Sequence, residues 1–152
     1  MMVILKKPGE NFAICGTDEQ YRYDAAQELL GNITQESYWL NEERTLSMVC
    51  DEDGKLKQLP VNFYMEGSGF ATPVVQFVGP AVFCKTKPVD PEAEDLYDYE
   101  LDEWTQDDIL QIINLLSEDQ QFGLAALYAQ AKERQVTLSE EGRKKYGFLV
   151  KL

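Results

Sequence analysis

The fold is decided by an apolar stretch in the middle of the chain that a turn dipeptide interrupts once: Val74-Val75-Gln76-Phe77-Val78-Gly79-Pro80-Ala81-Val82-Phe83-Cys84. Its β-branched and aromatic residues favour strands, and glycine followed by proline favours a turn. The pattern therefore predicts either one long buried strand or two short ones.

The residues before this stretch indicate an antiparallel sheet with one helix. An Asp53-Gly54 dipeptide, typical of hairpin turns, follows two β-prone segments that flank a polar turn. The spacing of Ala25, Ala26, Leu29 and Leu30 predicts one apolar helix face, with a stop signal at residues 31–32. The expected elements are strands at 2–5, 12–15, 37–40 and 46–50 and a helix at 21–30.

The residues after the stretch change in character. Prolines and a dense acidic run at 88–104 are typical of a linker. Thr105 with Asp107 and Asp108 predicts a helix start, because a hydroxyl cap and early acidic residues stabilise a helix amino terminus. A second helix to about Gln135 and a short third helix from Ser139 are expected to follow.

We therefore predict an α+β protein: a small, mostly antiparallel sheet with one packed helix, an acidic linker, and a helical carboxyl-terminal appendage. The expected division is an α+β domain at 1–87, the linker at 88–104 and the helical region at 105–152.

Composition narrows the class of protein. The chain has 152 residues, of which 44% are hydrophobic, as in ordinary globular proteins. No apolar run approaches the roughly 20 residues of a membrane helix, and the first residues do not have the order of a secretory signal. We expect a cytoplasmic protein that does not bind membranes.

The chain contains no histidine and three cysteines without paired spacing, Cys15, Cys50 and Cys84. The lack of histidine excludes Ser-His-Asp and Cys-His catalysis and histidine-ligated metals. Each cysteine has apolar neighbours, which favours a buried core thiol over a nucleophile. We expect no disulfide, no metal, no cofactor and no catalytic residue, while carboxylate-only chemistry stays open.

The charge is uneven along the chain. The net charge is −13, and residues 89–120 contain 12 acidic residues and no basic one. Such a charge repels phosphate backbones, so we expect no direct nucleic-acid binding. It favours a basic protein partner or serves solubility alone.

One string within the acidic run interleaves aromatic residues with carboxylates. Aromatic side chains dominate interface hot spots and carboxylates steer a basic partner, so this pattern is typical of a docking segment. The alternative is a solvated linker whose aromatic side chains fold back on the body of the protein. The candidate partner-binding residues are Tyr97, Asp98, Tyr99, Glu100, Asp102, Glu103 and Trp104.

Two short motifs favour turns over ligand sites. Asp51-Glu52-Asp53-Gly54 begins like a calcium loop, but the twelfth position is Asn62 where that loop needs glutamate. Gly67-Ser68-Gly69 precedes Pro73, which prevents the helix that follows a phosphate-binding loop.

Two segments resemble a known family. The stretch Cys50-Asp51-Glu52-Asp53-Gly54-Lys55-Leu56-Lys57-Gln58-Leu59-Pro60-Val61-Asn62, followed by Val78-Gly79-Pro80-Ala81-Val82, is similar to the domain of unknown function 3846. The resemblance covers roughly residues 1–85. It implies a protein of bacteriophages, plasmids or integrated elements, and it supplies no catalytic residues.

Three functions remain open. The first is a non-enzymatic accessory or interaction protein of a mobile element, which docks its acidic aromatic segment on another protein. The second is a DNA mimic that occupies the nucleic-acid site of a host defence protein. The third is a small-molecule binder or carboxylate-dependent enzyme, with a pocket near residues 66–69.

Overall fold

The computed structural model describes residues 1–66, 74–88, 92 and 99–116, and the fold is given for these residues. Their elements follow in the order β1 (Met2–Lys6), β2 (Ala13–Gly16), α1 (Arg22–Leu30), β3 (Gln35–Trp39), β4 (Leu46–Asp51), β5 (Val61–Glu66), β6 (Val74–Val78), β7 (Ala81–Lys85) and α2 (Gln106–Leu115). The predicted α+β class is confirmed.

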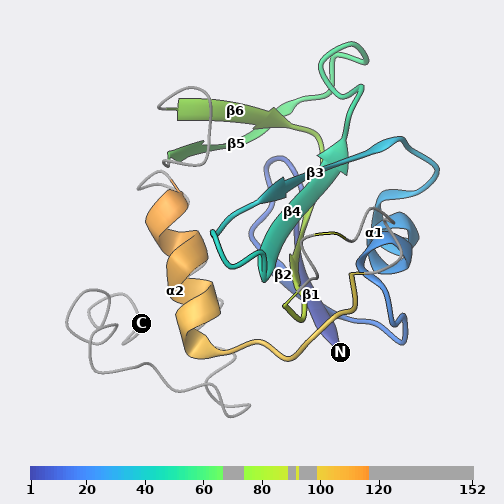
Figure 1. The fold of residues 1–152 in the computed structure, drawn as a ribbon. Helices are drawn as coiled ribbons and strands as arrows, with labels where there is room; N and C mark the ends of the chain where they lie inside the picture. Colours follow the sequence, from blue (N-terminus) through green and yellow to red (C-terminus); the bar gives the residue numbers. More distant parts are fainter. Residues whose placement is uncertain (67–73, 89–91, 93–98, 117–152) are drawn as a thin grey trace.

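The strands form two antiparallel sheets (Figure 1). In the described part of the chain, the main sheet has five strands in the order β2-β1-β7-β4-β3, and β5 and β6 form a second, small sheet. The predicted hairpin is the β3–β4 pair, in which Glu36 lies opposite Cys50. The central strand β7 pairs with β1 on one side and with β4 on the other.

Gly79 divides the apolar stretch of residues 74–84 into two strands that belong to different sheets. Its φ of 72° lies in the left-handed region, which only glycine adopts without strain. A Cβ atom added there would lie 2.7 Å from Cδ1 of Leu59. The stretch is therefore two short strands, β6 in the small sheet and β7 in the main one.

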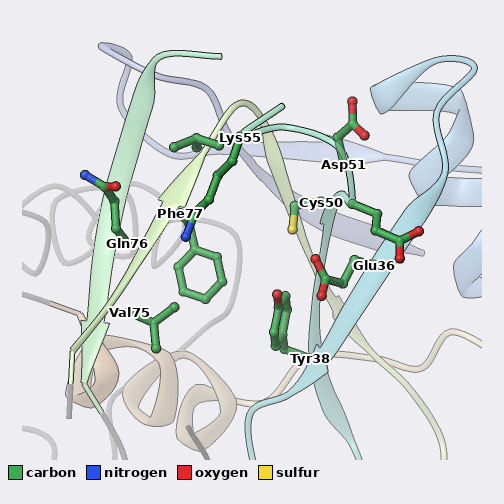
Figure 2. A pocket seen from close by; sticks show the side chains of 10 residues that line it. Glu36, Tyr38, Cys50, Asp51, Lys55, Val75, Gln76 and Phe77 are labelled. Carbon is green, nitrogen blue, oxygen red and sulfur yellow. The ribbon is translucent and has the colours of Figure 1, made fainter. Parts of the chain in front are cut away.

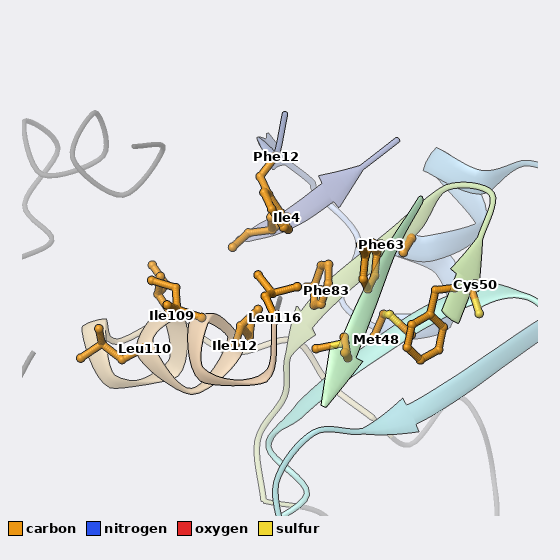
Figure 3. Close-up of a cluster of buried hydrophobic side chains, with 14 residues drawn as sticks. Ile4, Phe12, Met48, Cys50, Phe63, Phe83, Ile109, Leu110, Ile112 and Leu116 are labelled. Carbon is orange, nitrogen blue, oxygen red and sulfur yellow. The ribbon is translucent and has the colours of Figure 1, made fainter. Parts of the chain in front are cut away.

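Both faces of the main sheet are covered, as the alternation along β7 shows. Phe83 points into a larger core shared with the small sheet and α2, whereas Val82 and Cys84 point into a smaller core against α1. Figure 3 shows the larger core, which contains Ile4, Phe12, Met48, Cys50, Phe63, Met65, Phe77, Ala81, Phe83, Ile109, Leu110, Ile112, Ile113 and Leu116. Each core residue on a strand thus belongs to one of two layers according to its parity.

Helix α2 begins where the sequence predicts. The Thr105 hydroxyl accepts a hydrogen bond from the Asp108 backbone N–H at 3.4 Å, and the Asp108 carboxylate accepts one from the Thr105 N–H at 2.7 Å. Asp108 also binds Lys85 Nζ of β7 at 2.7 Å. These contacts complete a capping box and join the helix start to the central strand.

Residues 99–104 differ from the predicted solvated linker. Leu101 is 3% exposed and belongs to the smaller core. The backbone N–H of Leu101 donates to Gln20 O at 2.9 Å, and that of Asp102 donates to Lys85 O at 2.8 Å. Burial of one leucine and backbone hydrogen bonds on both sides outweigh the repulsion between neighbouring carboxylates.

The predicted boundaries near residues 87 and 104 do not coincide with a break in packing among the described residues. Helix α2 contributes four isoleucine and leucine side chains to the same larger core as β1 and β4, and a fifth comes from Leu116. Helix α2 therefore packs on the same core as the main sheet, and the division into a domain at 1–87, a linker at 88–104 and a helical region at 105–152 stays a prediction, because residues 117–152 lie outside the described residues. The expected loop at 67–69 and the expected helices to about 135 and from 139 lie outside the described residues.

The cysteines are free thiols that differ in burial. Cys50 and Cys84 are buried, as predicted for core thiols, and Cys15 is partly exposed. Burial raises the pKa of the Cys84 thiol to about 12. Burial and then the nearby Glu36 and Asp51 carboxylates raise the pKa of Cys50 to about 12.

A thiol reagent is therefore expected to label Cys15 alone in the folded protein at pH 8. With a pKa near 12, only roughly 10⁻⁴ of each buried thiol is ionised at that pH, and the thiolate is the reactive form. Counting the thiols that react with an aromatic disulfide reagent should give one in buffer and three in urea. In the Cys15→Ser variant the fast reaction should vanish, and fast labelling of Cys50 would contradict its burial.

Candidate functional site

The two described aromatic side chains of the predicted partner-binding segment, Tyr99 and Trp104, contact the protein's own body. The Tyr99 ring meets the Trp39 ring edge to face at 5.3 Å and lies 4.3 Å from the Arg22 guanidinium carbon. Trp104 donates its Nε1–H to the Met2 carbonyl at 3.0 Å and packs against the larger core. Tyr99 and Trp104 are thus engaged in the fold, while Tyr97 and Asp98 lie outside the described residues.

Arg22 is the buried cation of this contact. It is 4% exposed and contacts both the Trp39 and the Tyr99 ring, with its guanidinium carbon 5.1 Å from the centroid of the first. Its Nη2 donates to Ser37 Oγ at 3.4 Å, and its backbone N–H donates to Tyr99 O at 2.8 Å. Burial lowers the pKa of the guanidinium from its ordinary value, which reflects lost hydration that the two rings replace in part.

The carboxylates of the same segment have different surroundings. Glu100 accepts a hydrogen bond from Gln20 Nε2 at 2.8 Å and forms an exposed ion pair with Lys87 Nζ at 3.3 Å. The Asp102 carboxylate accepts the Glu103 backbone N–H at 2.9 Å, and Glu103 is exposed. Asp102 and Glu103 therefore present negative charge to solvent from a fixed backbone.

A cleft of about 250 Å³ opens between the main and the small sheet (Figure 2). Its inner end is aromatic and sulfur-lined, because Tyr38 and Phe77 meet edge to face at 5.3 Å beside Cys50. Charged side chains line its mouth. The lining residues are Glu36, Tyr38, Cys50, Asp51, Glu52, Lys55, Val75, Gln76, Phe77 and Val78.

The Glu36 carboxylate raises the pKa values of two other groups that line the cleft, Tyr38 and Cys50. Burial raises the pKa of the Tyr38 hydroxyl, and a hydrogen bond to the Glu36 carboxylate raises it further. The same carboxylate contributes to the raised pKa of Cys50. Tyr38 and Cys50 therefore keep their protons at neutral pH, so neither of these two side chains is an activated nucleophile or base.

One carboxylate at the mouth is already neutralised. Asp51 is 8% exposed, and its Oδ2 lies 2.6 Å from Lys57 Nζ. Burial alone would raise the pKa of Asp51, but hydrogen bonds from Lys57 Nζ and from the Asp53 backbone N–H lower it below its ordinary value. This carboxylate fixes the turn after β4 that carries Lys55 into the cleft.

The Asp51→Asn variant is expected to lose about 1 kcal/mol of the free energy of unfolding at pH 7, because Lys57 is half exposed and solvent screens the pair. A carboxylate with a lowered pKa in the fold stabilises above its unfolded pKa of about 4. The difference between wild type and variant should therefore narrow as the pH falls below about 4. Urea unfolding at pH 7 and pH 3 measures it, and a constant difference would contradict the ion pair.

The sequence patterns did not predict this cleft. A pocket was expected near residues 66–69, but the lining side chains come from β3, the end of β4, the turn after it, and β6. Glu36 and Tyr38 alternate along β3, so they share one face, and the β3–β4 register places Cys50 opposite Glu36. The two-residue spacing of Glu36 and Tyr38, together with their pairing to the strand of Cys50, is the sequence signal that could have placed these three residues at one site.

The described residues contain neither a metal-binding group nor a membrane-spanning helix. No group of three or more cysteine, aspartate, glutamate or histidine side chains is arranged to hold a metal ion there. No helix in the same part of the chain has the length and apolar character needed to span a membrane.

Comparisons with known proteins bear on the family. No curated protein and no solved structure matches the chain. A family model does match, over residues 1–107. This range is longer than the expected 1–85 and includes residues 99–104 and the capped start of α2. The match spans more than half of the 152 residues. The chain therefore belongs to the family described as Domain of unknown function (DUF3846).

Proposed function

We propose that this protein is a non-enzymatic binding protein whose small ligand occupies the cleft between the two sheets. The observation that carries the proposal is the cleft itself, in which aromatic walls and charges of both signs converge. A concave site with an apolar wall and a few polar groups is the usual form of a small-molecule site.

The chemistry of the cleft favours binding over catalysis. Tyr38 and Cys50 both have raised pKa values, so neither is poised as a base or nucleophile at neutral pH. The Tyr38 hydroxyl donates to the Glu36 carboxylate, and the Tyr38 ring and the protonated Cys50 thiol serve as packing surface. The histidine-free sequence agrees with a binding role.

The proposal is tested by screening a library of small polar molecules against the isotope-labelled full chain by amide NMR. Binders are expected to shift the amides of Glu36, Cys50 and Gln76, which line the cleft on three strands. A Val75→Phe variant should block these binders, because a larger side chain at this partly buried position fills the cleft. If no compound shifts these amides in the wild type, the proposal is wrong.

A second candidate function rests on the docked acidic segment. Asp102 and Glu103 extend from a backbone that hydrogen bonds fix to β7 and to residue 20. Fixed carboxylates on a chain of net charge −13 are suited to steer a basic protein of a phage or mobile element, or of its host. The aromatic residues Tyr99 and Trp104 then serve to hold this surface in place.

Neutralising Asp102 and Glu103 separates this candidate from a DNA mimic. For a basic protein partner recovered by affinity capture, the double change to Asn and Gln should slow association and weaken its salt dependence. For a DNA mimic the same change should abolish binding to a nucleic-acid-binding protein, because charge then carries the recognition. An unchanged association rate would remove the support for both.

A further inference from the structure

Two charges at the mouth of the cleft, those of Lys55 and Glu36, face each other without forming an ion pair. Lys55 directs its ammonium group into the cleft above the Phe77 ring, opposite the Glu36 carboxylate (Figure 2). Among the described residues, no carboxylate lies within 4.0 Å of Lys55 Nζ. A cation and an anion therefore line one small cavity with a gap between them.

The size and walls of the cleft limit what fills this gap. Its volume of about 250 Å³ is below the roughly 300–1,000 Å³ of sites for drug-sized ligands. Val75 and Phe77 give it an apolar side, which favours a ligand with a short hydrocarbon group. The Glu36 carboxylate lines the cleft on the side opposite Lys55, so the cationic end of a ligand belongs there (Figure 2).

Building on the cleft as a ligand site, we infer that the ligand is a small zwitterion of the α-amino-acid class with an aliphatic side chain. Its ammonium group binds Glu36, its carboxylate binds Lys55, and its side chain packs on Val75 and Phe77. Both ionic contacts are charge-assisted hydrogen bonds. Glu36 is partly buried and Lys55 is exposed, so solvent screens the contact to Lys55 more than the contact to Glu36. Asp51 takes no part, because Lys57 already neutralises it.

Three ligands of one carbon skeleton test the inference: L-leucine, its amine 3-methylbutylamine, and its acid 4-methylpentanoate. Each is titrated into the labelled full chain at pH 7, and the shifts of the cleft amides give the dissociation constant. L-leucine is expected to bind at least about tenfold more tightly than either half-ligand, because each of those leaves one charged partner without its contact.

Two variants assign the contacts. Lys55→Gln should weaken leucine binding about tenfold without weakening that of the amine, and Glu36→Gln should weaken leucine and the amine without weakening the acid. The matched controls Lys7→Gln and Glu43→Gln make the same changes of net charge at exposed positions away from the cleft lining. They should leave all three dissociation constants unchanged.

The outcomes separate this inference from the proposed function. If the amine or the acid binds as tightly as leucine, the cleft is a site for a single charge, so the zwitterion is wrong and the binding function stands. If none of the three shifts the cleft amides while a library compound does, the ligand class alone is overturned. If neither the series nor any library compound shifts them, both the ligand class and the binding function are overturned.

Discussion

Replacing Asn62 by alanine is expected to remove about 3–5 kcal/mol from the free energy of unfolding, a large share of the 5–15 kcal/mol typical of a domain. Asn62 is 6% exposed, and its Nδ2 donates to the carbonyls of Lys6 and Gly79 at 2.8 Å each. Its Oδ1 accepts from Lys6 Nζ, which is 3.0 Å away. One amide thus joins β5, β1 and the β6–β7 turn.

The size of the effect follows from what the alanine leaves behind. Two buried carbonyls lose a donor, and the ammonium group of Lys6, a residue that is 3% exposed, loses one acceptor. A buried polar group without its partner is more unfavourable than a lost exposed hydrogen bond. Urea unfolding measures the change, with Asn32→Ala as the control at an exposed asparagine. A loss below about 1 kcal/mol would show that water replaces the amide.

Replacing Arg22 by alanine is expected to destabilise the protein by about 3 kcal/mol, because the contacts of a buried guanidinium with two rings are lost and a cavity is left. Replacing Arg22 by methionine should restore most of this loss. A flexible apolar side chain fills the space beside the Trp39 and Tyr99 rings without the need to desolvate a charge.

The exposed ion pair of the same segment provides the control. Lys87→Ala removes a contact to Glu100 whose two side chains are 55% and 35% exposed, so it should change the free energy of unfolding by no more than about 1 kcal/mol. Tryptophan fluorescence during urea unfolding follows all three variants through Trp39 and Trp104. If Lys87→Ala costs as much as Arg22→Ala, surface charge and not stacking holds residues 99–104.

The elements that sequence patterns predicted correctly are those with an uninterrupted local signal. The β3–β4 hairpin has two β-prone segments around a polar turn, α1 is followed by its stop signal at Gly31 as expected, and α2 begins at its capping box. In each of these the residues that decide the element lie within a few positions of it. Local patterns were therefore sufficient.

Strand β5 was not predicted, because two of its features hide the alternation. A register shift between Val61 and Phe63 in the β5–β6 pair places Asn62 and Phe63 both in buried positions. Pro60, just before the strand, reads as its end and not its beginning. A buried asparagine beside a bulge has no signature in hydrophobic periodicity.

The cleft and the docking of residues 99–104 were not predicted for a different reason. Both depend on contacts between segments far apart in the sequence, such as Tyr99 with Arg22 and Tyr38 with Phe77. Composition describes the acidic run correctly as charged, but it does not weigh Leu101, which is buried among the described residues 99–104. The contribution of one apolar residue, whose backbone is also hydrogen bonded, is lost when composition is averaged over the whole run.

Because β7 lies at the centre of the main sheet, the sheet is not complete during synthesis until this late strand has been made. The hairpins β1–β2 and β3–β4 are made first, yet each needs β7, which comes last of the described strands, to join it to the other. Until residues 81–85 leave the ribosome, the growing chain carries two open strand edges with apolar faces. The nascent chain is therefore most exposed to aggregation, and to chaperones, in the interval just before this strand emerges.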